Sequence, residues 1–181
     1  VASQRTRTIK LGTGVVSVSY HNPLWVAERI VQLDHLTRGR VMLGLGPGAL
    51  PGDAAMLGIS IEDQRSALEE DMEPLMVLLR GETATFAGTY YQVEGLGLSP
   101  ALHPGLIPEL FLSGASEACV AAAATLGATR LSYTRPLNQF PPGPAGSGPL
   151  GLRLGVVTRP DRRAAWDAAR ARFPADRRGQ L

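Results

Sequence analysis

Short apolar runs alternate with amphipathic segments along this chain, and that alternation limits the fold more than any other feature. Five apolar runs predict strands: residues 9–18, 41–46, 109–112, 129–133 and 150–158. Four segments with apolar residues at helical spacing predict helices: residues 22–39, 60–81, 117–126 and 160–173. Strands that alternate with helices form βα units around a parallel sheet. The sequence therefore predicts an α/β fold with about five parallel core strands, and residues 83–93 add a hairpin that turns at Ala87-Gly88.

Capping residues and prolines mark where the predicted helices begin and bend. Asn22 suits an N-cap, because its side chain can accept a hydrogen bond from a free amide of the first turn. Ser60 and Asp63 resemble a capping box before the second helix. Pro74 lacks an N–H group and should kink or divide that helix. The Pro- and Gly-rich segment 136–149 cannot hold a regular helix and predicts a loop.

The composition excludes several classes of protein. The 181 residues are 44% hydrophobic and 19% charged, which is typical of a globular domain and not of a disordered chain. No apolar run approaches the roughly 20 residues of a membrane span, and the first residues lack a signal-peptide pattern. Cys119 is the single cysteine, which excludes an intrachain disulfide and a cysteine metal cluster. We therefore expect a cytoplasmic protein with no membrane partner.

Positive charge gathers toward the carboxyl terminus. From Leu150 onward eight arginines accompany three aspartates, although the whole chain has a net charge of only +2. Nucleic-acid binding would need a basic stripe with interleaved aromatic residues. Here the arginines surround one predicted helix whose apolar side holds Trp166 and Phe173, so we interpret them as a solvated helix face. No nucleic-acid partner is expected.

Residue types that carry hydrolytic or metal chemistry are not arranged for it. The histidines, His21, His35 and His103, show no ligand spacing, so no metal site is predicted. A nucleophile elbow is absent and Cys119 has no evident base, which excludes a hydrolase triad. We expect a structural role for His35 and solvent exposure for His103. His21 follows a predicted strand and is the one histidine expected near a site.

Two glycine-containing turns follow predicted strands. Residues 113–116 lead into a helix, where free amides and the helix dipole favour a phosphate; the alternative is ordinary capping by Ser116. Residues 44–49 formally match the G-x-G-x-x-A pattern of dinucleotide-binding proteins. A Rossmann helix would begin inside that pattern, but Leu50-Pro51-Gly52 prolongs the loop. The segment is then either a glycine-rich turn or a loop that lies against a flat cofactor ring.

Thr13-Gly14-Val15-Val16 lies inside the first predicted strand, where a glycine indicates a bulge or a close backbone approach. It belongs to a set of five ordered stretches: IKLGTGVVSVSYHNP, LDHLTRGRVMLGLGPG, FAGTYYQVEG, PELFLSGASE and LRLGVVTRP. In this order and spacing the chain resembles the bacterial luciferase-like flavin monooxygenases, a family that includes alkanesulfonate monooxygenases. The resemblance covers nearly the whole chain. It implies a TIM-type (β/α) barrel that binds FMN at the carboxyl face of its strands.

The resemblance assigns three groups of residues to the cofactor. A strand bulge with a non-proline cis peptide beneath the isoalloxazine ring is matched by Thr13, Gly14 and Val15, with Gly14–Val15 as the expected cis bond. The phosphate-binding turn is matched by Ser113, Gly114, Ala115 and Ser116. The loop on the phosphate side is matched by Gly46, Pro47 and Gly48. The luciferases have a cysteine and an arginine where this chain has Gly46 and Pro47, so that arginine contact is absent and light emission is not implied.

The resemblance also implies an oxidoreductase, a flavin-dependent monooxygenase. Reduced FMN, supplied by a separate flavin reductase, would react with O2 and oxygenate a small organic substrate. No residue is assigned as the catalytic acid or base, because the family's catalytic histidine and substrate residues often lie on the first strands, which this sequence lacks. Two alternatives stay open: a deazaflavin-dependent hydride-transfer oxidoreductase of the same superfamily, and a catalytically inactive flavin-binding subunit.

The predicted barrel is incomplete. A whole barrel takes about 250 residues and eight strands, so residues 1–181 are expected to form one partial barrel domain. Within it, segment 136–149 stands in place of a helix. Either the chain is part of a longer gene product, or it is a reduced relative that pairs its open sheet edges with another subunit. Open edges with apolar faces promote association, so the second case predicts an obligate dimer and we expect a homo-oligomer.

Overall fold

One parallel sheet organises the chain in the computed structural model, which describes residues 1–48, 50–102, 107–114, 116–133 and 148–172. Its six strands are β1 (Leu11–Gly12), β2 (Val16–Ser17), β3 (Val41–Gly46), β6 (Glu109–Ser113), β7 (Thr129–Tyr133) and β8 (Leu150–Arg153). Both β1 and β2 pair with β3 on the same edge, so they are two halves of one strand. The described sheet therefore has five strand positions, as the sequence predicts.

The order of the strands decides between the two kinds of parallel α/β fold. Across the sheet the order is β1/β2, β3, β6, β7 and β8, which follows the chain without a reversal. A Rossmann sheet reverses direction at its switch point, whereas a barrel wall adds each strand beside the last. The sheet is therefore part of a TIM-type barrel, and the fold predicted from the sequence is confirmed.

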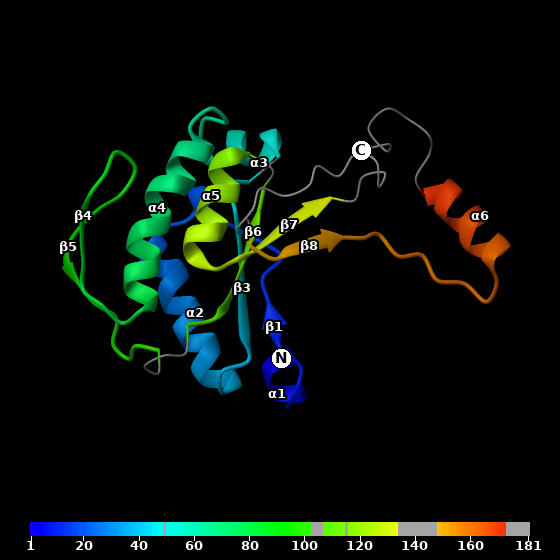
Figure 1. Ribbon diagram of the computed structural model, residues 1–181, viewed down its shortest axis with the longest axis horizontal. Coiled ribbons are helices and arrows are strands. Elements are labelled where there is room, and N and C mark those ends of the chain that lie inside the picture. The colour runs from blue at the N-terminus through cyan, green and yellow to red at the C-terminus, as the bar shows by residue number, and fades with distance from the viewer. Residues whose placement is uncertain (49, 103–106, 115, 134–147, 173–181) are drawn as a thin grey trace.

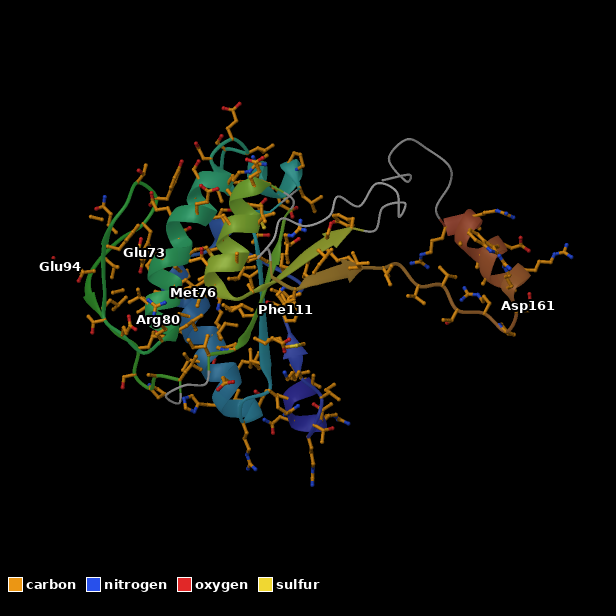
Figure 2. All side chains as sticks on the ribbon, in the orientation of Figure 1. Glu73, Met76, Arg80, Glu94, Phe111 and Asp161 are labelled. Carbon is orange, nitrogen blue, oxygen red and sulfur yellow. The ribbon has the colours of Figure 1, made fainter. Side chains whose placement is uncertain are left out.

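Helices cover one face of this sheet (Figure 1). The covering helices are α2 (Pro23–Thr37), α4 (Gln64–Leu79) and α5 (Glu117–Leu126). Val41, Leu43 and Leu45 of β3 point toward them and join the buried core. We call the opposite face, which carries Met42, Gly44 and Phe111, the inner face; Phe111 lies near the middle of the sheet in Figure 2.

Shorter elements surround this body. They are α1 (Ala2–Arg5), the 3-10 turn η1 (Val18–Tyr20), α3 (Pro51–Leu57), the hairpin strands β4 (Ala84–Ala87) and β5 (Gln92–Leu96), and α6 (Arg162–Arg172). In Figure 1 α6 stands away from the sheet, and none of its described residues is buried. No helix in the described ranges is both long and apolar enough to cross a bilayer.

Several boundaries follow the local sequence signals. Asn22 caps α2, because its Oδ1 accepts a hydrogen bond from the Leu24 amide at 2.9 Å. Strands β3 and β7 and helix α5 have the predicted bounds. The predicted hairpin forms, but its turn spans Gly88 to Tyr91, whose backbone groups are joined by a hydrogen bond of 2.9 Å.

Other predictions from the sequence are wrong in detail. Helix α4 is not divided at Pro74: it runs from Gln64 to Leu79, and the Pro74 ring is fully buried in the core, so packing offsets the missing N–H bond. The capping box does not form: Ser60 Oγ accepts from the Glu62 amide instead. Helix α3 begins where a loop was expected, with Pro51 at its first position.

The carboxyl-terminal predictions are partly revised. Strand β8 ends at Arg153 and not at residue 158; Arg153 pairs with Tyr133, the last residue of β7. Residues 154–159 have no regular structure. Of the predicted loop 136–149, residues 136–147 lie outside the described part of the chain, and so do Phe173 and His103.

Candidate functional site

The first strand is interrupted at Thr13, whose side chain replaces the regular ladder of backbone bonds. The Thr13 hydroxyl donates to the Gly44 carbonyl at 2.8 Å and accepts from the Gly44 amide at 2.9 Å. Its single proton is therefore used within the sheet, and this hydroxyl is not a donor for a ligand. The Gly14–Val15 peptide that follows is cis, which is the bond expected from the resemblance.

Gly44 and Gly46 make room for this interruption. A Cβ atom at Gly44 would overlap the Thr13 carbonyl oxygen, and one at Gly46 would lie 2.9 Å from a methyl group of Val15. The same Cβ at Gly46 would lie 3.5 Å from Ser113 Cβ. The glycines of the dinucleotide-like pattern thus allow the chain's own bulge to lie against β3. They bring Val15 on one side and Ser113 on the other together over Gly46.

The loop after β3 is fixed against η1. Ser19 Oγ donates to the Pro47 carbonyl at 2.6 Å. Gly48 has φ +85°, and a Cβ there would lie 2.6 Å from the Tyr20 hydroxyl. Both the backbone conformation and the space therefore require glycine at position 48. Gly46, Pro47 and Gly48 lie at the carboxyl end of β3, where the resemblance locates the phosphate side of the cofactor.

The turn from β6 into α5 needs small residues, because one of them caps the helix and another lies against Cys119. Ser116 is the N-cap of α5, because its Oγ accepts from the Cys119 amide at 3.2 Å. The capping alternative is thus confirmed, but it leaves the amides of Glu117 and Ala118 without an intrahelical acceptor. A Cβ at Gly114 would lie 2.8 Å from Cys119 Sγ. Ala115 lies outside the described residues.

A cavity of about 240 Å³, the turn cavity, opens beside this turn. Its lining is mainly apolar and also includes Pro47, Arg65, Glu69, Ser113, Gly114 and Ser116. Arg65, from the first turn of α4, is a residue that the sequence analysis did not single out. Its only signal was its place just inside a predicted helix, which by itself says nothing about which strand end the side chain would reach.

Arg153 is a second cation that the sequence analysis missed. Its Nη1 donates to Ser113 Oγ at 3.4 Å, and its guanidinium lies 4.8 Å from the centre of the Tyr133 ring. The register explains this contact, because Tyr133 and Arg153 are partners on β7 and β8. Ser113 therefore has one guanidinium hydrogen-bonded to it and shares the turn cavity with another.

The remaining candidates contribute little to this site. Burial raises the pKa of the Cys119 thiol, and the nearby Arg130 offsets only part of that rise, so the thiol stays protonated at neutral pH. His35 Nε2 lies 2.9 Å from the Ala101 carbonyl oxygen, in keeping with a structural role. His21 lines a different cavity, described below. In the described part of the chain, no three His, Cys, Asp or Glu side chains form a metal-binding group.

The chain is similar in sequence to known monooxygenases. It is 56% identical to limonene 1,2-monooxygenase from Rhodococcus erythropolis over 84 residues, which cover 46% of this chain and 22% of that protein. It is 42% identical to 4-hydroxyprotoasukamycin monooxygenase from Streptomyces nodosus subsp. asukaensis over 138 residues, which cover 75% of this chain and 37% of that protein. The chain thus spans well under half the length of these relatives.

Solved structures share the fold. Monooxygenase RslO1 from Streptomyces bottropensis superposes with a TM-score of 0.69 at 27% identity, over 73% of this chain and 40% of that one. The oxygenating constituent of 3,6-diketocamphane monooxygenase from Pseudomonas putida, solved with FMN, gives 0.62 at 22% identity, over 74% and 41%. An F420-dependent secondary alcohol dehydrogenase gives 0.63 at 21% identity, over 73% and 41%. The last two likenesses concern the fold alone.

The match to a family model agrees with the architecture and with these likenesses. The model of the luciferase-like monooxygenases covers residues 1–140, which include the bulge, the glycine loop and the turn before α5. The chain belongs to the luciferase-like monooxygenase family.

Proposed function

We propose that this chain is the FMN-binding part of a flavin-dependent monooxygenase that oxygenates a small organic substrate with O2. The observation that carries the proposal is the meeting of Val15 and Ser113 over Gly46. It joins the strand bulge, expected beneath the flavin ring, to the turn expected at the phosphate. Both lie at the carboxyl edge of the parallel sheet, where barrel enzymes bind their ligands.

Part of the turn cavity suits a phosphate, namely the start of α5 and Arg65, while the rest of its lining is apolar apart from Glu69. The free amides at the start of α5 and the positive end of its dipole favour an anion. Arg65 lines the same cavity and supplies the positive charge that Pro47 cannot. We assign the phosphate to Ser113, Gly114, Ala115, Ser116 and Arg65, with Gly46, Pro47 and Gly48 as the adjoining loop. Thr13, Gly14 and Val15 would lie against the ring.

The chemistry would come from the cofactor, and the chain would supply position and shelter. When bound in its reduced form, FMN supplies the electrons with which O2 is activated. The inner face would bound the substrate space, because Met42, Phe111 and Leu131 project from it and are only partly buried. Such a surface suits an apolar substrate, and limonene is the first compound to try.

A deazaflavin-dependent hydride-transfer enzyme is the second candidate. An F420-dependent dehydrogenase shares the fold at 21% identity, whereas the relatives at 56% and 42% identity are named monooxygenases. The higher identities support FMN and O2. We further propose that residues 1–181 form one partial barrel domain, that a separate reductase supplies reduced FMN, and that the protein is a cytoplasmic homo-oligomer.

Titration of the full-length protein with oxidised and reduced FMN tests the proposal. We expect saturable quenching of flavin fluorescence, and oxygen consumption that depends on limonene once a flavin reductase and NADH are added. Binding of a deazaflavin in place of FMN, with hydride transfer and no oxygen uptake, would select the second candidate. FMN binding without any turnover would select an inactive flavin-binding subunit, and no FMN binding at high micromolar concentration would end the proposal.

A further inference from the structure

A second cavity, of about 490 Å³, lies between η1, the start of α2, the first half of α4 and the tip of the hairpin. We call it the Asp71 cavity. Asp63, Ala67 and Asp71 border it at intervals of four residues, so they share one side of α4. Arg65, Leu68 and Met72, which line the turn cavity, lie on the opposite side of the same helix. The Asp71 cavity is therefore separated by α4 from the proposed phosphate site.

Asp71 is an unsatisfied carboxylate on the wall of this cavity. Its side chain belongs to a residue that is only 5% exposed, and its Oδ1 atom has no hydrogen-bond partner among the described residues. Buried carboxylate oxygens almost always accept hydrogen bonds, so an orphan of this kind needs an explanation. Burial raises the pKa of Asp71 to about 6, with the Glu70 carboxylate adding to the rise. The group is thus largely ionised at neutral pH.

Several of the neighbouring donors are already engaged. The amides of Thr89, Tyr90 and Tyr91 all donate to the Glu70 carboxylate. The Tyr90 hydroxyl donates to Asp63 Oδ1 at 3.2 Å, and Gln64 Nε2 donates to the Tyr20 hydroxyl at 3.0 Å. No arginine or lysine occurs in the described lining of the cavity, which carries Asp63 and Asp71 as its acidic groups. The lining also holds His21, Asn22 and the Tyr91 hydroxyl, and none of these donates to Asp71 Oδ1 in the structure.

We propose that the Asp71 cavity binds a small organic ammonium ion, whose N–H group donates to the Asp71 carboxylate. Oδ1 itself is closed to solvent, so the ligand would meet the other carboxylate oxygen, and rotation about the Cβ–Cγ bond exchanges the two. The aromatic side chains of Tyr20, Tyr90 and Tyr91 also border the cavity and suit the alkyl part of such an ion. A volume of about 490 Å³ falls in the range of small-molecule pockets.

The acidic groups of the Asp71 cavity and the lack of a ligand cluster among the described residues argue against an anion and against a divalent metal ion. An anion would be repelled by Asp63 and Asp71. A divalent metal ion would need six or more oxygen ligands, and the described residues contain no group of three candidate ligand side chains. An ammonium ion needs a carboxylate that accepts from its N–H groups, which Asp71 offers, and aromatic faces beside its alkyl part, which the three tyrosines offer. The proposal does not depend on flavin binding, because α4 separates the two cavities.

Calorimetric titration of the full-length protein with n-butylammonium tests this inference, with n-butanol as the neutral probe. We expect saturable binding of butylammonium and none of butanol. Asp71→Asn keeps the shape of the side chain and should weaken binding at least about tenfold. Glu73→Gln is the matched control: Glu73 lies on the same helix, is exposed and is outside the lining, and Figure 2 labels it. It should leave the affinity unchanged.

A second variant keeps the test valid if Asp71→Asn fails to fold. Ser60 is exposed at the rim of the cavity, so Ser60→Phe should narrow the entrance without disturbing the core and abolish binding while Asp71 is intact. Each variant is checked by its circular dichroism spectrum. The inference is overturned if the wild-type protein shows no saturable binding, if butanol binds equally well, or if Asp71→Asn or Ser60→Phe folds and binds like the wild type.

Discussion

At the residue scale, the proposed phosphate site depends on Arg65. Pro47 occupies the position of the luciferases' arginine, yet Arg65 lines the cavity beside the turn before α5. If it pairs with the phosphate, Arg65→Ala should raise the Kd for FMN about tenfold to a hundredfold, the value of a charge-assisted bond. The Kd for riboflavin, which lacks the phosphate, should not change.

Fluorescence titration with both flavins measures this difference. Arg29→Ala serves as the control, because Arg29 is exposed on α2 and does not line the turn cavity. Equal weakening of FMN and riboflavin would show that Arg65 supports the fold and not the phosphate.

Gly44 is the residue on which the bulge most depends. A methyl group at this position would overlap the backbone carbonyl of Thr13, which cannot move as a flexible side chain can. We expect Gly44→Ala to lower the free energy of unfolding by about 1–3 kcal/mol, the usual cost of overpacking, and to abolish flavin binding. Urea denaturation measures the loss. Gly52→Ala, where no atom lies within 4 Å of the new methyl, should stay within about 1 kcal/mol of wild type.

Asp71 makes the stability depend on pH. Its pKa rises from 3.8 to about 6 on folding, so the folded protein holds this proton more tightly than the unfolded chain. Stability from this group is therefore greatest below pH 4, falls as the pH rises to about 6, and stays low above that. Relative to wild type, Asp71→Asn should gain on the order of 2–3 kcal/mol between pH 4 and pH 8. Urea melts of both proteins across this range measure the difference, and parallel curves would contradict it.

At the element scale, one carboxylate fixes the tip of the hairpin to α4. Glu70 accepts from the amides of Thr89, Tyr90 and Tyr91. Desolvation acts to raise the pKa of Glu70, but these backbone bonds outweigh it and the pKa is lowered. Glu70→Ala should therefore speed amide hydrogen exchange at residues 89–91 and leave the strands of the sheet protected.

Hydrogen exchange followed by NMR tests this prediction, with Glu73→Ala as the control on the same helix. In the wild-type protein the protection should be lost only as the pH falls through the lowered pKa of Glu70, because protonation removes the acceptor. Unchanged exchange in Glu70→Ala would mean that the tip is held by its strands alone.

Elements with local signals could be predicted, and those fixed by distant neighbours could not. The Asn22 cap and the apolar period of α5 are encoded within a few residues, and both elements form as expected. Pro74 stays in a continuous helix because the core surrounds it, and the position of β8 is set by its pairing with β7. The same limit applied to the site. Its glycines stood out in the sequence, but Arg153 reaches Ser113 through the pairing of β7 with β8, and Arg65 lines the turn cavity through the position of α4.

At the scale of the whole molecule, the described sheet has unpaired strands at both edges, β1/β2 and β8. Apolar residues along the second edge are open to solvent, with Leu152 47% and Leu154 68% exposed. We expect the 181-residue chain, expressed alone, to self-associate through this edge. Sedimentation velocity should show dimers or larger species, and Leu152→Lys with Leu154→Lys should shift them toward monomer.

Ile61→Lys is the control for that experiment, because Ile61 is exposed in a loop away from the sheet edge. A monomeric wild-type chain, or equal dissociation by the control, would contradict association through β8.

The interruption at Thr13 also shifts the phase of its strand. Gly12 pairs with Met42 but Val16 pairs with Leu45, so four steps along one strand match three along the other. In an uninterrupted strand Ser17 would point to the same side as Leu11, toward the helices; with the extra residue it pairs with Gly46 and points inward. Pairing the strand without a bulge but with all its residues would shift Val16 opposite Gly46 and exchange the two sides from Val16 to the start of η1, whereas deleting one residue from the interruption would keep Val16 opposite Leu45. The extra residue therefore reverses the alternation of side chains within the strand. Leu11 points toward the helices, and Ser17, six residues later, points toward the inner face.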